Sequence, residues 1–403
     1  MTDNFSALGV ASDLVATLKE RGIHSPSPIQ LITIPDALAG RDVCGKAKTG
    51  SGKTLAFGIP MVERLSNAGS SKNGSGQVRS SNSSSGSTRG LILVPARELA
   101  LQVAKELRPL AERRKLRLAP LYGGEPIEAQ VSKIQAGLDI IVATPGRLID
   151  LIDRKALFVS ELKFVVVDEA DRMADMGFLP QVEWILRHVE SRHQTLLFSA
   201  TLDAAVDALV HRYQTKPVRH EVQSRQVTVD EMQHRFVAVH QMDKLKVAAT
   251  IIAASNRTLV FCATRYGCDR LSRDLKSLGV RAEPIHGDLR QNIRERSLAR
   301  FMLGKIQALV ATDVAARGLH IDDVDVVVHY DPAPDYKTYL HRSGRTARAG
   351  ETGMAVTLSL WNQELEVKRL QRRLALDMPI VEMFSNDERL VALDRWDPVA
   401  QPV

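Results

Sequence analysis

The sequence predicts an α/β protein with more than one domain, and three observations lead to this prediction. Short, almost uniformly apolar runs alternate with amphipathic helical stretches, as in parallel sheets whose strands are buried on both faces. The 403 residues exceed what one ordinary core supports, and 44% hydrophobic with 25% charged residues is typical of a globular protein. The expected strands are residues 91–94, 140–143, 164–167, 195–198, 258–261, 308–311 and 324–328.

The alternation divides the chain into two parts. It stops after residues 199–201 and their following helix, and residues 216–230 are polar and lack helical periodicity. It restarts with an expected strand at 237–240 and a helix at 244–254. We therefore expect an N-terminal domain over 1–218, a C-terminal domain over 219–375 and a short tail over 376–403. No short-period repeat is visible, but the halves are similar enough in size to be distant copies of one fold.

Three further features limit the functional classes. Residues 66–90 are rich in Ser and Gly and predict a flexible, solvated loop. Cys44, Cys262 and Cys268 make no disulfide framework or metal motif, so we expect a reducing, cytoplasmic compartment. No run approaches a membrane span. The net charge of +7 permits a nucleic-acid partner without demonstrating one. An expected amphipathic helix over 362–374 has a basic face. Such a face is usually exposed to solvent and has no ligand.

Residues 47–54, AKTGSGKT, carry the strongest local signal for a nucleotide site. Glycines let a loop wrap an anion with its N–H groups, and the helix that follows adds its positive end. Lys53 is expected to reach the β- and γ-phosphates, and the Thr54 hydroxyl to bind Mg²⁺. The usual pattern has Gly where this chain has Ala47. The remaining expected nucleotide-binding residues of this loop are Thr49, Gly50, Ser51 and Gly52.

The partner signal, Asp168-Glu169-Ala170-Asp171, directly follows an expected buried strand. An acid at such a strand end is where a phosphate-bound Mg²⁺ is held, so Asp168 is the second expected metal residue. Glu169 is expected to orient or deprotonate the attacking water. The alternative is a plain helix start, which acidic residues also favour. Together the two signals predict hydrolysis of a nucleotide, with ATP and Mg²⁺ as cofactors.

The same four residues spell D-E-A-D, and the chain resembles the DEAD-box family of RNA helicases, with motifs in the family's order from Phe5 to Gly350. The resemblance implies two tandem RecA-like domains, each a mostly parallel sheet flanked by helices. Residues 22–30 are similar to the family's adenine-reading motif. It implies that Gln30 binds the adenine edge while Phe5 and Ile23 pack around the base.

In the first half, the resemblance also implies backbone contacts to RNA and a coupling motif. The matching segments are 95–100, 123–124, 144–147 and 199–201, with Ala96 in place of the family's threonine. Backbone N–H groups, hydroxyls and arginines bind phosphates without reading sequence. The implied RNA contacts are Arg97, Gly124, Thr144 and Arg147. The residues implied to couple hydrolysis to strand separation are Asp171, Ser199 and Thr201.

The second half supplies the remaining motifs. Asp313 is implied to contact the ribose, and His341 to take part in coupling. Arg345 and Arg348 match arginine fingers, whose fixed positive charge suits a phosphoryl transition state. This chain departs from the family at His320, Ser343 and Ala347. The implied RNA contacts of this half are Thr264, Gly287, Gln291, Arg294, Thr312 and Arg317.

The resemblance implies an ATP-dependent RNA helicase in which ATP and RNA favour each other's binding as the domains close. Two alternatives stay open: an ATP-gated RNA clamp within a larger assembly, and a DNA helicase on the same scaffold. The expected partner is RNA, single-stranded or duplex, bound without sequence preference. The family's roles also imply ribosomal or RNA-decay proteins as partners. We expect a monomer that does not associate with membranes.

Overall fold

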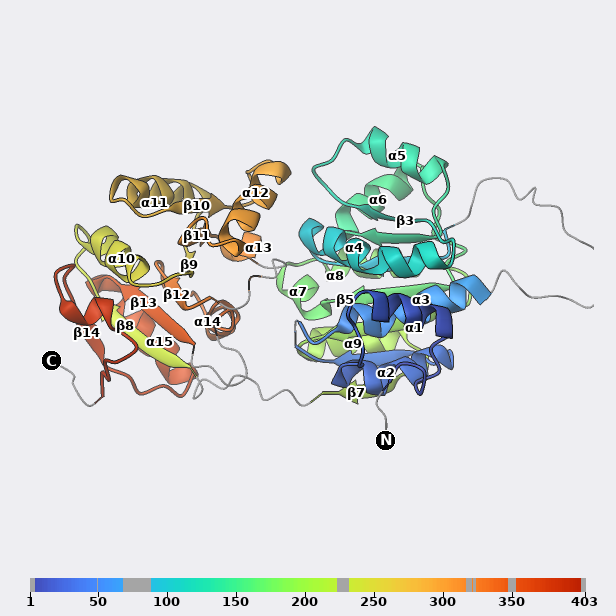
Figure 1. The fold of residues 1–403 in the computed structure, drawn as a ribbon, viewed down its shortest axis with the longest axis horizontal. Coiled ribbons are helices and arrows are strands. Elements are labelled where there is room, and N and C mark those ends of the chain that lie inside the picture. Colours follow the sequence, from blue (N-terminus) through green and yellow to red (C-terminus); the bar gives the residue numbers. More distant parts are fainter. Residues whose placement is uncertain are drawn as a thin grey trace, which may run out of the picture. The chain divides into compact units, whose positions relative to one another are not determined.

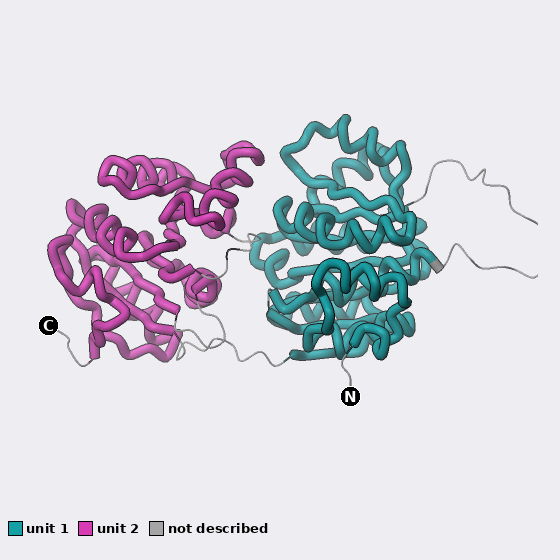
Figure 2. Tube along the Cα trace, viewed as in Figure 1, with its two compact units in different colours: residues 1–224 teal, residues 225–403 magenta. Residues whose placement is uncertain are grey.

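The computed structural model describes residues 4–48, 50–67, 88–222, 232–316, 321, 324–346 and 353–399. The chain forms two compact units, residues 1–224 and 225–403 (Figure 2). The division falls six residues after the expected boundary. Thr49, Arg317, His320, Ala347, Arg348 and most of the expected 66–90 loop lie outside the described residues.

The first unit contains one seven-stranded parallel sheet, in the order β3-β4-β2-β5-β6-β1-β7 (Figure 1). Its central strands are almost entirely apolar, which explains their burial on both faces. Its strands are β1 (Val43–Lys46), β2 (Gly90–Leu93), β3 (Leu118–Leu121), β4 (Ile140–Ala143), β5 (Phe164–Asp168), β6 (Gln194–Ser199) and β7 (Val218–Glu221).

Nine helices in the described part of the first unit cover the two faces of this sheet. One face packs against α1 (Ser12–Glu20), α2 (Pro28–Leu38), α3 (Lys53–Asn67) and α4 (Arg97–Arg113). The other packs against α5 (Ile127–Gln135), α6 (Pro145–Asp153), α7 (Ala170–Asp175), α8 (Leu179–Arg187) and α9 (Ala204–Tyr213).

The second unit repeats the same topology. Its parallel sheet has the order β10-β11-β9-β12-β13-β8-β14, which in chain order is the same arrangement as in the first unit. The two halves are therefore copies of one fold, which the sequence had left open. Its strands are β8 (Gln233–Ala238), β9 (Thr258–Phe261), β10 (Ala282–Ile285), β11 (Ala308–Ala311), β12 (Val326–His329), β13 (Met354–Ser359) and β14 (Ile380–Glu382).

The helices of the second unit also form two layers. The helices α10 (Lys244–Ala253) and α11 (Arg265–Ser277) pack on one face of the sheet. The other face carries α12 (Gln291–Met302), α13 (Asp313–Ala316), α14 (Tyr336–Ser343) and α15 (Glu364–Arg373). No helix in the described parts of the chain is long and apolar enough to cross a membrane.

Residues 376–399, which belong to the segment 376–403 expected to be a short tail, contribute to the second unit. Strand β14 pairs with β8 at the edge of the sheet. The segment then returns over the face that carries α10, where the 3₁₀-helix η3 (Glu388–Val391) packs and Trp396 is buried. Most of this segment is polar, but a few of its apolar residues, among them Leu390, Leu393 and Trp396, are buried in the core of the second unit.

Candidate active site

Every motif residue of the first unit that the structure describes, apart from Phe5, Ile23 and Gln30, lies at or just beyond the carboxyl end of a strand. The loop 47–52 follows β1, Asp168 is the last residue of β5, and Ser199 is the last residue of β6. These three strands are neighbours in the sheet, since β6 pairs with both β5 and β1. Ligands of open parallel sheets bind at this edge. The topology therefore brings together residues that are more than a hundred positions apart in the chain.

The loop 47–52, here called the phosphate-type loop, is hydrogen-bonded to the start of α2. The Ser27 hydroxyl donates to the Ser51 carbonyl oxygen over 2.8 Å, and Gln30 Nε2 donates to the Gly52 carbonyl oxygen over 2.9 Å. Gly52 has a φ of +90°, and a Cβ there would lie 2.6 Å from Gln30 Nε2. Only glycine fits this position, because both the conformation and the space exclude a side chain.

This arrangement bears on the residues expected to bind adenine. The Gln30 amide already has one bond on each side, because Oε1 also accepts from the Ser27 N–H over 2.9 Å. An amide keeps a second N–H and a second lone pair for another partner. Ile23 is half-buried beside the core. Phe5 is only 1% exposed, so in this structure its ring presents no open surface to a base.

Lys53 is the first residue of α3 and carries a buried ammonium group. Its Nζ has no hydrogen-bond partner among the residues that the structure describes. A buried, unsatisfied donor costs free energy and indicates a function. Its charge acts on Asp168, so the two groups lie close together.

Asp168 is fully enclosed, and burial raises the pKa of this carboxyl to about 7. The positive charge of Lys53 opposes this rise in pKa, while the negative charges of Glu169 and Asp171 add to it. Asp168 Oδ1 also accepts from the Glu169 N–H over 2.9 Å, which favours the ionised form. A pKa shifted this far by burial and named charges is typical of a functional site.

Glu169 adopts a left-handed conformation with a φ of +54°. This region is uncommon for a residue with a side chain and is often found where function fixes the backbone. Its carboxylate is 3% exposed and accepts from Arg172 over 2.8 Å. The strained backbone and the ion pair hold Glu169 in one orientation next to Asp168.

Asp171 joins the β5 end to the β6 end. Its Oδ2 accepts from the N–H groups of Ala200 and Thr201 over 3.2 and 3.1 Å. Ser199 Oγ in turn accepts from the Asp171 N–H over 3.1 Å. The three residues expected to couple hydrolysis to strand separation are therefore in direct contact.

Thr54, expected to bind a metal, lies close to Glu106 of α4. Burial raises the pKa of Glu106, and the nearby Thr54 hydroxyl partly offsets the rise. Sequence reasoning missed Glu106, which lies in an ordinary amphipathic helix. No group of three or more His, Cys, Asp or Glu side chains suited to a metal occurs within the described ranges. The Asp168 carboxylate and the Thr54 hydroxyl are oxygen ligands, which fit a Mg²⁺ that takes its other ligands from phosphates and water.

The expected RNA contacts of the first unit lie on the other half of the same edge. They follow β2, β3 and β4, which are adjacent strands. The Arg97 guanidinium lies over Gly124, where a Cβ would come within 2.5 Å of it at a φ of +94°. Thr144 precedes the first turn of α6, and Arg147 Nη1 donates to the Glu125 carbonyl oxygen over 3.0 Å.

The second unit places its expected RNA contacts after the corresponding strands, β9, β10 and β11. Thr264 caps α11 by accepting from the Gly267 N–H over 3.0 Å. Gly287 is exposed and Gln291 begins α12. Thr312 and Arg294 are buried, Arg294 to 5% exposure, so they offer little surface to a ligand in this structure.

Asp313, expected to contact a ribose, is held by a residue that sequence reasoning left without a role. Arg342 donates to both Asp313 oxygens, over 2.6 and 2.8 Å, and to the Asp331 carbonyl oxygen over 2.8 Å. Its guanidinium lies 5.0 Å from the centre of the Phe261 ring. The available signal was its position next to His341 in the motif. Arg345 is 9% exposed, so this expected finger lies largely within the unit.

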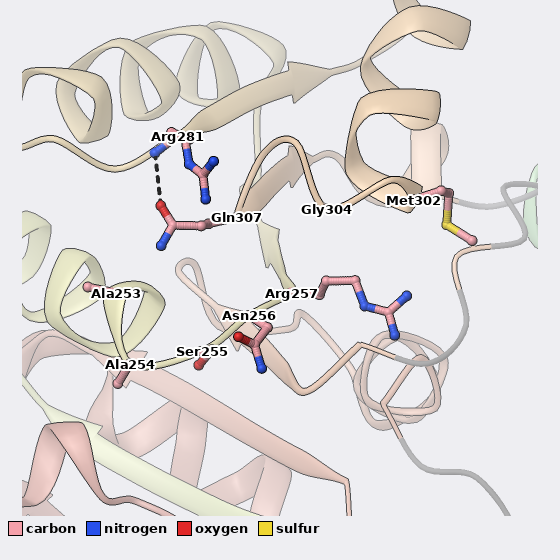
Figure 3. A pocket seen from close by; sticks show the side chains of 9 residues that line it. All are labelled: Ala253, Ala254, Ser255, Asn256, Arg257, Arg281, Met302, Gly304 and Gln307. Carbon is pink, nitrogen blue, oxygen red and sulfur yellow. Dashed lines mark hydrogen bonds between the residues drawn. The ribbon is translucent and has the colours of Figure 1, made fainter.

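A separate hollow of about 450 Å³ lies at the opposite edge of the second sheet (Figure 3). Arg257, Arg281 and Gln307 directly precede β9, β10 and β11, and the Arg281 N–H donates to Gln307 over 3.3 Å. The hollow therefore opens at the amino ends of these strands, away from every motif residue.

Comparison with known proteins agrees with this geometry. Residues 27–209 match the DEAD/DEAH box helicase model, and residues 240–350 match the helicase conserved C-terminal domain. This chain belongs to the DEAD-box family of ATP-dependent RNA helicases. The family's two domain models fall one in each unit of the structure.

Relatives and solved structures place the chain further. It is 41% identical over 359 residues to the DEAD-box ATP-dependent RNA helicase CshA of Bacillus licheniformis, covering 89% of this chain and 70% of the relative. It is 38% identical over 392 residues to CshA of Bacillus subtilis, covering 97% and 76%. The S. cerevisiae Dbp5 structure with RNA and ADP BeF3 matches with a TM-score of 0.78 and 28% identity, covering 97% and 98%.

Proposed function

We propose that this chain hydrolyses ATP when RNA is bound, and uses closure of its two units to open short RNA duplexes or remodel RNA–protein complexes. One observation carries the proposal. In the first unit, Lys53, Asp168 and Glu169 gather at the ends of β1 and β5, beside a phosphate-type loop, while the expected RNA contacts follow β2, β3 and β4. Each ligand has its own half of one sheet edge.

The chemistry follows from the residues. The loop N–H groups and Lys53 bind the phosphates of ATP. Asp168 and Thr54 would hold Mg²⁺, which would supply positive charge against the phosphate oxygens. Glu169 orients the attacking water. Arg345 and Arg348 of the second unit supply positive charge in the transition state.

Coupling between the ligands rests on the Asp171 contacts. Because Asp171 accepts from the two residues that follow β6, a change at the Asp168 end of β5 reaches Ala200 and Thr201 through one hydrogen bond each. RNA bound across both units then stabilises the same closed state as ATP, so each ligand raises the affinity for the other. A monomeric, cytoplasmic protein suits this cycle, with ribosomal or RNA-decay proteins as partners.

The test is steady-state ATP hydrolysis without nucleic acid, with single-stranded RNA, and with DNA of the same sequence. We expect stimulation by RNA alone, and a loss of about 10²–10⁴-fold in the Glu169→Gln variant, as for removal of a general base. Glu190→Gln is the matched control, since Glu190 is exposed and lies just before β6 at the opposite edge. Equal stimulation by DNA, or turnover without RNA, would contradict the proposal.

A clamp that holds RNA with little turnover shares every motif with a helicase. A duplex with a single-stranded extension separates the two activities. Strand release during ATP turnover indicates a helicase, whereas RNA retained with ATP and no release indicates the clamp.

A further inference from the structure

Helix α15 packs through only one of its faces. Val367, Leu370 and Leu374 are buried in a cluster with Phe236 of β8 and Tyr339 of α14. The opposite face carries Leu365, Arg369 and Arg372, which lie at i, i+4 and i+7 and therefore on one line along the helix. All three are exposed, Leu365 to 58%. This face of the helix covers nothing within the described part of the unit.

An exposed tryptophan extends this face at its amino end. Trp361 lies in the 3₁₀ turn η2 (Trp361–Gln363), which runs directly into α15, four residues before Leu365. It is 82% exposed, whereas Trp396 of the same unit is 4% exposed. Packing of the unit does not require the Trp361 indole, which leaves both of its faces available to a ligand.

The carboxyl half of α15 is strongly basic. Lys368, Arg369, Arg372 and Arg373 are all exposed, and none of them forms an ion pair with any residue that the structure describes. Glu364 and Glu366 stand on the two flanks of the exposed line. Cations in a last helical turn interact favourably with the helix dipole, which accounts for Arg372 and Arg373. The dipole does not account for Trp361 and Leu365 at the other end.

We propose that this face is a second contact site for single-stranded RNA, outside the motif residues. It comprises Trp361, Leu365, Lys368, Arg369 and Arg372. A base stacks on Trp361, and the phosphates that follow lie along the basic line, which extends about 10 Å from Leu365 to Arg372 at the rise of an α-helix. An aromatic platform followed by cations suits a single strand of any sequence.

The position of the face makes the two RNA sites distinct. The expected RNA contacts of this unit follow β9, β10 and β11, at one side of the sheet, while α15 packs on Phe236 of β8 at the other side. Charge favours RNA over a protein ligand, because the face carries three cations beyond its two exposed apolar side chains, while Glu364 and Glu366 lie only on its flanks. The inference rests on the proposed function for the identity of the ligand, and adds a site that prolongs contact with long strands.

The experiment measures how tightly the full chain, with a non-hydrolysable ATP analogue, binds single-stranded RNAs of increasing length. One variant is Trp361→Ala and the other is Arg369→Gln with Arg372→Gln. The matched control, Arg273→Gln with Lys276→Gln, removes the same charge from exposed positions of α11, on the other face of the sheet. ATP hydrolysis stimulated by the shortest effective RNA is measured in every variant.

For long RNA, we expect Trp361→Ala to weaken binding at least about five-fold, the lower range for a stacked base. For the double arginine variant, the slope of the logarithm of the binding constant against the logarithm of the salt concentration should become about 1.4 less steep. Short RNA should stimulate ATP hydrolysis equally in all variants. Long RNA should protect the fluorescence of Trp361 from quenching by acrylamide. Long-RNA affinities equal to the unmodified chain in both variants would overturn the inference, and would leave the face to a protein partner. Failure of the proposed function is recognised separately, because short RNA would then not stimulate the unmodified chain.

Discussion

The two units place an ionisable side chain at the same point of the same fold and give it different surroundings. Asp168 ends β5 and His329 ends β12, each the fourth strand of its seven-stranded sheet and each preceded by three valines. Burial drives both toward the neutral form, raising the pKa of Asp168 to about 7 and lowering the pKa of His329 well below its ordinary value. At the end of both strands, the fold therefore disfavours the charged form of an ionisable side chain.

The cations beside these two groups differ. In the first unit, Lys53 Nζ has no hydrogen-bond partner within the described residues. In the second, Arg342 donates to Asp313 and to the Asp331 carbonyl oxygen, and lies over the Phe261 ring. We infer that the first unit reserves its cation for a ligand, while the second uses its cation to hold its own loops together.

The largest expected effect is on activity, from Lys53→Met. Removing the ammonium group takes away a donor to the phosphates, so we expect ATP hydrolysis to fall about 10²–10³-fold, as for loss of one transition-state donor. Stability should change little, because no hydrogen bond is broken and the cost of burying an ammonium group without a hydrogen-bond partner is removed. Hydrolysis rates and the urea midpoint of the same preparation measure both effects.

The same substitution should alter Asp168. Without the Lys53 charge, the pKa of Asp168 should rise above about 7, which carbon-13 spectroscopy of labelled aspartate can follow. Lys46→Met is the control, because Lys46 ends β1, two strands from β5, and pairs with Glu221. If Lys53→Met unfolded the first unit, its ammonium would be structural and the contrast would fail.

Much of this site could be predicted from the sequence, because local patterns reported on buried strands. The expected strands 140–143, 258–261 and 308–311 match β4, β9 and β11 at both ends, since each is apolar on both faces. The expected strands did not include β1, β3, β7, β10, β13 and β14. Of these, β3 and β10 each contain a proline and lie at an edge of the sheet, where alternate side chains are less buried.

Contacts between distant segments could not be predicted. The sequence contains the Asp171 and Thr201 motifs, but their hydrogen bonds depend on β5 and β6 being neighbours in the sheet. The Arg342–Asp313 pair likewise depends on the placement of α14 beside the end of β11. Glu106 carries no local signal, because its contact with Thr54 arises only when α3 and α4 pack together.

The second prediction concerns stability, from Arg342→Met. This change leaves the Asp313 carboxylate and the Asp331 carbonyl oxygen without their donor. We expect the second unit to lose about 2–3 kcal/mol, somewhat less than a fully buried pair, because the Asp313 side chain stays 25% exposed. Urea unfolding with Trp184→Phe and Trp361→Phe makes Trp396 report on this unit alone.

A double variant separates the ion pair from the cation's other contacts. Arg342→Met with Asp313→Asn should recover part of the loss, since the unpaired charge is removed. An Arg342→Met variant as stable as the unmodified chain would show that the second unit does not depend on this cation, and would remove the contrast with Lys53.

The smallest expected effect is on the pH dependence of the second unit. His329 accepts at Nδ1 from Arg342, which can only donate, so its Nε2–H donates to Ser343 Oγ over 3.1 Å. Burial first, and then the charges of Arg342 and His234, lower its pKa. The unfolded chain therefore binds a proton below about pH 6.5 that the folded unit does not.

The sign of this effect follows from the lowered pKa of His329. Its contribution to stability is complete above about pH 6.5 and is lost as the pH falls below that value, by at most about 1.4 kcal/mol per pH unit. His329→Gln should flatten the pH dependence of Trp396-reported unfolding between about pH 6.5 and 5. Arg342→Met should flatten it less, because burial, the larger cause, remains. Asp168 gives the opposite slope in the first unit, since ionising a carboxyl with a raised pKa weakens the fold as the pH rises toward about 7. Equal slopes for the His329→Gln variant and the unmodified chain would mean that burial at the end of β12 does not control this imidazole, and the correspondence between the two strand ends would be geometric only.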